Sequence, residues 1–96
     1  MPRNRKPRIC GCPFDELMCR VFKPAGIPMT KLQQIPLFQD ELEAMRLCDI
    51  EELTQEDAGK KMGVSRGTVQ RLLADGRKKT VCALTEGKAL ILKNEQ

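Results

Sequence analysis

Apolar and charged positions alternate at helical spacing from about residue 39 onward. Leu42, Met45 and Cys48 recur on one side of the segment with Ala44 and Leu47 beside them, and the other side holds the charged residues Asp40, Glu41, Glu43 and Arg46. This periodicity predicts an amphipathic helix over residues 39–50. Acidic residues in its first turn would suit the positive end of the helix dipole.

Two further helices are predicted from their end signals. Thr54 opens the sequence Thr-Gln-Glu-Asp, which has the form of a capping box, so a short helix is expected over residues 55–62. Gly63 suits the left-handed residue that ends such a helix. Ser65 is a typical N-cap, and it predicts a third helix over residues 66–86.

One stripe of the third predicted helix is apolar or small, and Gly87 follows as its expected end. The stripe comprises Val69, Leu72, Leu73, Gly76, Thr80, Ala83 and Leu84. Residues 89–92 are apolar as well, but their pattern fits a strand as well as a helix extension.

The first part of the chain has a different character. All six prolines lie within residues 1–36, and proline both fixes φ and removes a backbone donor. We therefore expect a basic, proline-rich, extended arm over 1–36 and a domain over 37–96. Some strand character at residues 19–23, followed by a turn at 24–26, leaves room for a short β element in a mainly α-helical, three-helix fold.

Composition narrows the function. The 96 residues are 41% hydrophobic and 31% charged, as expected for one folded domain. The chain has no His, Tyr or Trp, so histidine-based catalysis and most aromatic stacking platforms are excluded, and we expect neither enzymatic activity nor a cofactor. With no long apolar run and no hydrophobic region behind the basic start, we expect a cytoplasmic protein that does not span a membrane.

The net charge of +4 is distributed in blocks. Residues 40–57 sum to −7, whereas residues 58–79 sum to +6 and residues 1–39 to +5. The two basic blocks are the surfaces that a polyanion would meet. The acidic block would repel DNA, so we expect it to face away from any bound duplex. It would then be a solvated helix face or a contact for a protein such as RNA polymerase.

The second and third predicted helices have the spacing of a helix-turn-helix. Three residues, Gly63-Val64-Ser65, separate them, and the small residues Ala58 and Gly59 precede the turn. Because helices that cross steeply need a small residue at the crossing, we expect Ala58 and Gly59 to lie where the third helix passes. Val64, Val69 and Leu72 are expected to fill the wedge between the two helices.

The opposite face of the third helix is polar and predicts binding to double-stranded DNA. A recognition helix contacts base edges near its N-terminus, where Arg pairs with guanine and Gln with adenine. Residues 66–79 would then lie in the major groove, with Arg66 and Gln70 as the base contacts. The full predicted contact set is Ser65, Arg66, Gly67, Thr68, Gln70, Arg71, Lys60, Lys61, Arg77, Lys78 and Lys79, with Arg3 and Arg5 of the arm reaching the minor groove or the phosphates. The alternative interpretation of residues 1–8 is a disordered, solubilising tail.

A resemblance supports this interpretation. Residues 57–73, Asp-Ala-Gly-Lys-Lys-Met-Gly-Val-Ser-Arg-Gly-Thr-Val-Gln-Arg-Leu-Leu, followed by Gly-Arg-Lys-Lys at 76–79, resemble the fourth region of bacterial sigma factors, which reads the −35 promoter element. Nearly the whole chain also resembles a small family of uncharacterised, predicted DNA-binding proteins, domain of unknown function 134. Its hallmarks here include Phe-Lys-Pro-Ala-Gly-Ile-Pro at 22–28, which generic helix-turn-helix proteins lack, Asp-Glu-Leu-Glu-Ala-Met-Arg-Leu at 40–47 and Glu-Gly-Lys-Ala at 86–89.

The resemblance implies a sigma-region-4-like, winged-helix-related fold and a role in transcription. Two glycines depart from the pattern, since Gly67 replaces a longer polar residue and Gly76 replaces the usual Ala. Each costs a helix about 1 kcal/mol relative to Ala, so Gly76→Ala is expected to raise the melting temperature.

Other interpretations remain open. Cys10, Cys12 and Cys19 could hold a soft metal or form a reversible disulfide switch, which would make the protein a metal- or thiol-sensing regulator, whereas Cys48 and Cys82 fit core positions. The three-helix module could instead serve as a protein–protein adaptor. A module this small binds short DNA sites weakly, which favours a homodimer on two half-sites.

Overall fold

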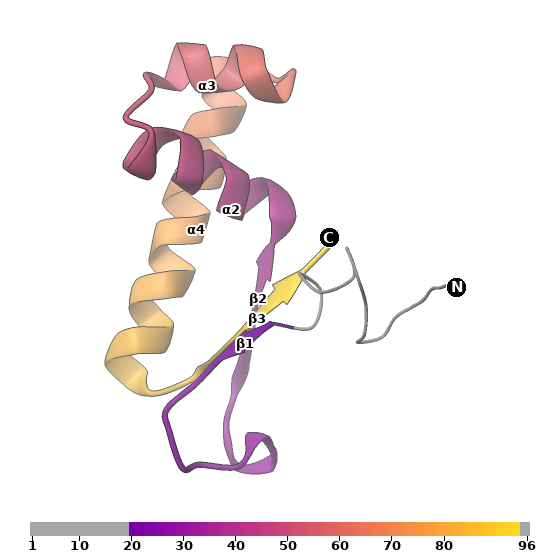
Figure 1. The fold of residues 1–96 in the computed structure, drawn as a ribbon, viewed down its shortest axis with the longest axis vertical. Helices are drawn as coiled ribbons and strands as arrows, with labels where there is room; N and C mark the ends of the chain where they lie inside the picture. Colours follow the sequence, from indigo (N-terminus) through magenta and orange to yellow (C-terminus); the bar gives the residue numbers. More distant parts are fainter. Residues whose placement is uncertain (1–19, 95–96) are drawn as a thin grey trace, which may run out of the picture.

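The computed structural model describes residues 20–94, which form three α-helices, a π-helical turn and a three-stranded sheet (Figure 1). The helices are α2 (Gln39–Met45), α3 (Gln55–Met62) and α4 (Arg66–Glu86), and the strands are β1 (Val21–Phe22), β2 (Gln34–Phe38) and β3 (Ala89–Lys93). A single 3₁₀ turn, Met29–Lys31, precedes β2. None of the helices between residues 20 and 94 has both the length and the apolar character needed to cross a lipid bilayer.

The bounds predicted for the second and third helices are confirmed, because local capping determines them. Thr54 Oγ1 accepts a hydrogen bond from the Asp57 amide at 3.0 Å at the start of α3. Gly63, at φ 75°, ends α3 in the left-handed conformation that glycine adopts without steric cost. At the start of α4, Ser65 Oγ accepts from the Thr68 amide at 3.2 Å.

The helix predicted over residues 39–50 is divided. Regular α-helix ends at Met45, and Arg46–Ile50 continues as a wider π-helical turn in which the Glu51 amide donates to the Arg46 carbonyl at 3.1 Å. Glu52 then adopts φ 60°, which is unusual for a residue with a side chain. This widened, sharply turned exit redirects the chain into α3, a change that helical periodicity alone does not predict.

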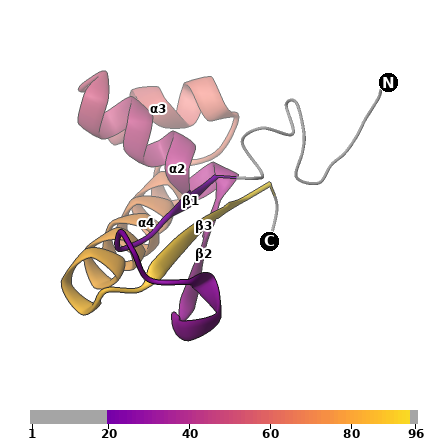
Figure 2. The ribbon, with the colours of Figure 1, turned by 60° about the horizontal axis from the view of Figure 1, so that its bottom comes forward.

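The sheet extends the fold into the segment that we expected to be an arm. β3 lies in the middle, antiparallel to β1 and parallel to β2 (Figure 2). Val21 is opposite Ile91, and Ile35 is opposite Leu90. The predicted boundary at residue 36 therefore falls inside β2. Pro36 is accommodated because β2 is an edge strand.

β3 also settles the ambiguity at residues 89–92 in favour of a strand. It follows α4 in the chain but pairs with two strands that precede the helices, so residues 20–94 place no β-hairpin after α4. The sheet thus differs from the wing that a winged-helix relationship leads one to expect.

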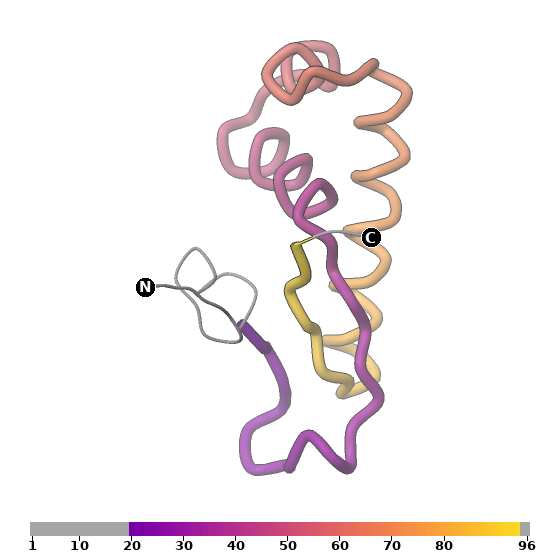
Figure 3. Tube along the Cα trace, turned by 90° about the vertical axis from the view of Figure 1, so that its right-hand side faces the viewer, coloured from indigo at the N-terminus to yellow at the C-terminus, as the bar shows by residue number. Residues whose placement is uncertain are grey.

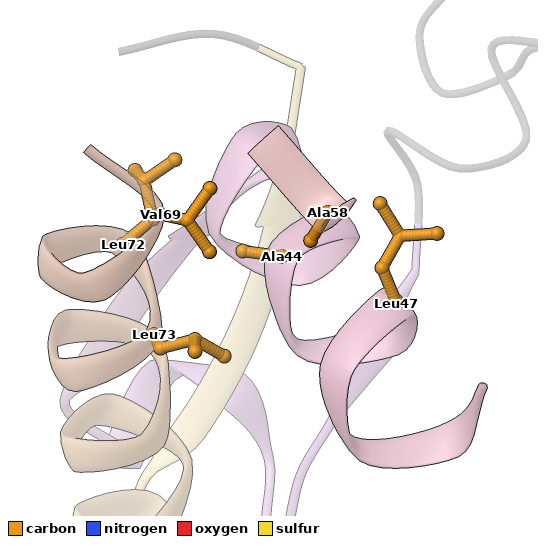
Figure 4. Packing of buried hydrophobic residues seen from close by; sticks show 6 residues of the cluster. All are labelled: Ala44, Leu47, Ala58, Val69, Leu72 and Leu73. Carbon is orange, nitrogen blue, oxygen red and sulfur yellow. The ribbon is translucent and has the colours of Figure 1, made fainter. Parts of the chain in front are cut away.

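Two apolar clusters hold the elements together along α4. One joins α2, its π-helical turn, α3 and the first half of α4, and it comprises Ala44, Leu47, Ala58, Val69, Leu72 and Leu73 (Figure 4). The other joins the sheet to the second half of α4, and it comprises Leu37, Ala83, Leu90 and Leu92. Met45 packs against both clusters.

α4 is therefore the element that both clusters share, with α3 across one of its ends and the sheet beside the other (Figures 1 and 3). Most of its predicted stripe is inward-facing, as expected. Leu84 is the exception, because 78% of its surface is exposed. A 21-residue helix continues past the end of its three-helix environment, so the direction of burial over its last turns depends on the sheet rather than on the helices.

Candidate nucleic-acid interface

The turn between α3 and α4 depends on a very close approach of two backbone segments. A β-carbon on Gly59 would lie 2.6 Å from the Val64 carbonyl oxygen, and the Val64 amide donates to the Gly59 carbonyl at 2.9 Å. Ala58, next to Gly59, is fully buried. The small residues therefore lie at the crossing as predicted, and they fix the start of α4 relative to α3.

The wedge between the two helices is filled differently from our expectation. Val69 and Leu72 are buried there, and Met62 packs against the same cluster. Val64, in contrast, is an exposed residue at the turn, because its backbone rather than its side chain makes the close contact with α3.

The first turns of α4 present polar side chains away from the core. Arg66, Gly67, Gln70 and Arg71 are all exposed, while Val69 on the opposite side is buried. The Arg66 guanidinium donates from Nη1 to Gln55 Oε1 at 3.3 Å, which links it to the start of α3. Arg71 lies 3.9 Å from Asp75 through Nη1 and Oδ2, and the side chains of Arg66, Gln70 and Arg71 place nitrogen donors on one exposed helical surface.

Ser65 and Thr68 have a structural task at this helix start. Besides the cap described above, the two hydroxyl oxygens lie 3.0 Å apart. Both side chains stay at the surface or partly so, but their polar atoms already stabilise the first turn. Ser65 and Thr68 belong to the predicted contact set, and they also stabilise the start of α4.

The predicted phosphate contacts separate into two groups. Lys60, Lys61 and Lys78 are exposed, and among the described residues no ion pair engages them. Arg77 instead reaches Asp49 on the π-helical turn, with Nε donating to Oδ2 at 3.2 Å, and this hydrogen bond raises the pKa of the guanidinium. Its charge is therefore offset by a neighbour.

Lys79, also predicted as a phosphate contact, has partners within the protein. Its Nζ lies 2.8 Å from Glu41 Oε1 and 4.3 Å from the centre of the Phe38 ring, and the side chain is largely buried. Glu41 is only 3% exposed and also accepts from the Phe38 amide at 3.0 Å. Lys79 neutralises this buried carboxylate and so serves the packing of α4 on α2.

Sequence reasoning missed Glu41 and Asp49 as partners of α4. Both lie in the acidic block that we expected to face away from DNA, and Glu41 in particular is not on a solvated face. The alternation of a −7 block with a +6 block was the available signal, because oppositely charged helices that are adjacent in sequence often pack together.

Several predictions lie outside the described residues: Arg3 and Arg5 of the arm, and Cys10, Cys12 and Cys19 of the possible metal or redox site. Cys48 and Cys82 are partly buried free thiols, and Cys48 packs against the helical cluster. Between residues 20 and 94, Cys, Asp and Glu side chains form no group of three placed to hold a metal ion.

Comparison with known proteins identifies relatives without a described activity. The family model "Protein of unknown function DUF134" matches residues 1–96. A UPF0251 protein of Shewanella sediminis is 46% identical over 97 residues, covering 100% of this chain and 97% of that protein. A UPF0251 protein of Vibrio vulnificus is 46% identical over 95 residues (99% and 92%), and one of Clostridium beijerinckii is 55% identical over 69 residues (72% and 47%). No solved structure matches the chain significantly.

Proposed function

This chain belongs to the DUF134 family, and on that premise we propose that it binds double-stranded DNA sequence-specifically, as a non-catalytic regulator of transcription. In this proposal α3 and α4 act as a helix-turn-helix. Residues 66–79 of α4 enter the major groove, whose width admits an α-helix.

The observation that carries the proposal is the exposed polar surface at the start of α4, next to a turn that the backbone holds rigidly. The close approach of the Gly59 and Val64 backbones, with a 2.9 Å hydrogen bond between them, positions α4 against α3, and Arg66 and Gln70 are exposed about one turn apart. A pre-positioned donor array is what base recognition requires, because each well-aligned bidentate contact discriminates against the wrong base by about 1–3 kcal/mol.

Each side chain has a distinct part in this proposal. Arg66 donates to guanine O6 and N7, and Gln70 pairs with adenine N6 and N7. Arg71 contacts a base or the backbone beside them. Lys60, Lys61 and Lys78 neutralise phosphates, and these contacts make the affinity depend on salt without adding sequence information.

Selection from a pool of random duplexes tests the proposal. We expect the wild-type protein to enrich a short motif. Arg66→Ala and Gln70→Ala should each lose preference at one position of that motif, while Arg20→Ala, an exposed arginine beside β1, should enrich the same motif as wild type. Enrichment of no motif at low salt would contradict the proposal and favour a role as a protein–protein adaptor.

A further inference from the structure

We infer that the end of α4 remote from the turn, together with β1, is a self-association surface at which two copies of this chain pair about a two-fold axis. We call it the distal patch, and it consists of Val81, Leu84, Phe22 and Pro24 with the groove beside them, which the core residue Leu90 also lines. The inference rests on the proposed function for its purpose, which is to present two recognition helices to one duplex.

Exposed apolar side chains gather at this end of the molecule. Leu84 is 78% exposed and Val81 is 56% exposed, and their i, i+3 spacing places them on one ridge of α4. Phe22, on the neighbouring β1 segment, is 59% exposed. Scattered apolar residues on a surface are ordinary, but three large ones on adjoining elements form a patch typical of an interface.

The patch contains a hollow as well as a ridge. A groove of about 600 Å³ runs between Phe22, Pro24, Ala83, Leu84 and Leu90. A contact about a two-fold axis requires one surface to be complementary to itself. Here the projecting Leu84 and Val81 of one copy can enter the groove of the other, and the reverse contact forms at the same time.

Charge favours a second copy at this patch. Lys23 and Lys88 border the groove, and Lys88 is paired with Glu86 at 2.9 Å. Because the border carries both signs, two patches can meet with opposite charges facing each other. The start of α4 is unsuited to self-association, since its exposed Arg66 and Arg71 would repel those of a second copy.

The length of α4 gives the pairing a use. Between the Arg66–Gln70 pair and the Val81–Leu84 ridge the helix rises about 22 Å. Two copies joined at the ridge therefore place their recognition residues at most about 44 Å apart, and a crossing angle between the helices brings this to the roughly 34 Å of one DNA turn. The same patch could not serve if it lay beside the turn.

Sedimentation without DNA tests the inference. In a concentration series that extends to millimolar, we expect the wild-type protein to form a dimer. The Leu84→Glu and Val81→Glu proteins should remain monomers, with circular dichroism spectra unchanged from wild type. Ile50→Glu is the matched control, because Ile50 is an equally exposed apolar residue (75%) on the π-helical turn. That variant should remain dimeric.

Two results would overturn the inference: a monomeric wild-type protein at every concentration, or a dimer that Ile50→Glu dissociates and Leu84→Glu does not. DNA titration separates this from the proposed function. Leu84→Glu should keep wild-type affinity for a duplex with one half-site, but its affinity for a duplex with two half-sites should fall roughly 100-fold. A dimer that binds no DNA would uphold the distal patch and reject the proposed function.

Discussion

The carbonyl oxygen of Val64 lies 2.6 Å from the point that a β-carbon on Gly59 would occupy. The close contact is between two backbone segments, so it cannot be relieved by rotating a side chain. Gly59→Ala must therefore push α3 and the turn apart. We expect a loss of about 2–3 kcal/mol in the free energy of unfolding, as for overpacked cores, measured by chemical denaturation.

Gly67→Ala is the control for this substitution. It makes the same chemical change in a helix, but a β-carbon there would meet only Ser65 Oγ at 4.0 Å. We expect it to be neutral or to stabilise the protein by up to about 1 kcal/mol, because Ala favours the helix over Gly. Equal stability of the Gly59→Ala and Gly67→Ala proteins would show that the crossing does not depend on the small residue.

Lys78 and Lys79 are adjacent in sequence but differ in role. Lys79→Ala leaves the carboxylate of Glu41 buried without its cation, so we expect a loss of about 3 kcal/mol in unfolding free energy. At a temperature where it is folded, the Lys79→Ala protein should bind DNA with the same affinity as wild type. Lys78→Ala should do the reverse, with stability within about 0.5 kcal/mol of wild type and weaker binding.

The two variants are distinguished by thermal unfolding and by titration with the selected duplex. If Lys79→Ala weakened DNA binding as much as Lys78→Ala and left stability unchanged, the claim that Lys79 stabilises the fold through its ion pair with Glu41 would be contradicted.

Asp49 offsets the charge of Arg77, and its removal should strengthen DNA binding. In Asp49→Ala the guanidinium is released toward the duplex, and one acidic group is lost near the groove. Both changes favour phosphate contact, so the slope of log K against log salt should steepen by about one unit. Stability should fall by no more than about 1 kcal/mol, because the side chains of this ion pair are 52% and 43% exposed.

Arg77→Ala provides the comparison for Asp49→Ala. If Arg77 contacts a phosphate once Asp49 is removed, the double variant Asp49→Ala with Arg77→Ala should show the salt slope of wild type or a shallower one. A salt slope unaffected by Asp49→Ala would mean that Arg77 lies too far from the backbone of the duplex to contribute.

The ends of α3 and α4 were predictable because local residues determine them. Thr54, Gly63, Ser65 and Gly87 each act within one turn of their own position, through a side-chain cap or a left-handed backbone. The outward face of α4 was predictable for the same reason, since helical periodicity alone separates Val69 from Gln70. These features carry most of the candidate interface.

The sheet and the partners of the basic residues were not predictable, because both depend on distant segments. β1 and β2 gain their pairing from β3, which lies more than 50 positions later in the chain. Lys79 reads as one more member of a basic run until α2 places Glu41 against it. Leu84 reads as core until the sheet takes a different side of α4.

Gly76 illustrates the same limit in a stability prediction. Helix propensity alone favours Gly76→Ala, but a β-carbon there would lie 3.2 Å from Met45 Cε and 3.4 Å from Glu41 Cβ. The flexible end of Met45 can shift a little, so we now expect a net change within about 0.5 kcal/mol rather than the full propensity gain of about 1 kcal/mol. Gly76→Val, which demands more room, should destabilise clearly in the same denaturation assay.

Dimethyl sulfate interference on the selected duplex tests the central proposal most directly, because the reagent methylates guanine at N7 in the major groove and adenine at N3 in the minor groove. We predict that methylation at one or more guanines blocks binding of the wild-type protein, and that Arg66→Ala removes the interference at one of them while Arg20→Ala does not. Interference confined to adenine N3 would contradict the placement of α4 in the major groove, and a guanine pattern identical in wild type and Arg66→Ala would contradict the contact between Arg66 and guanine.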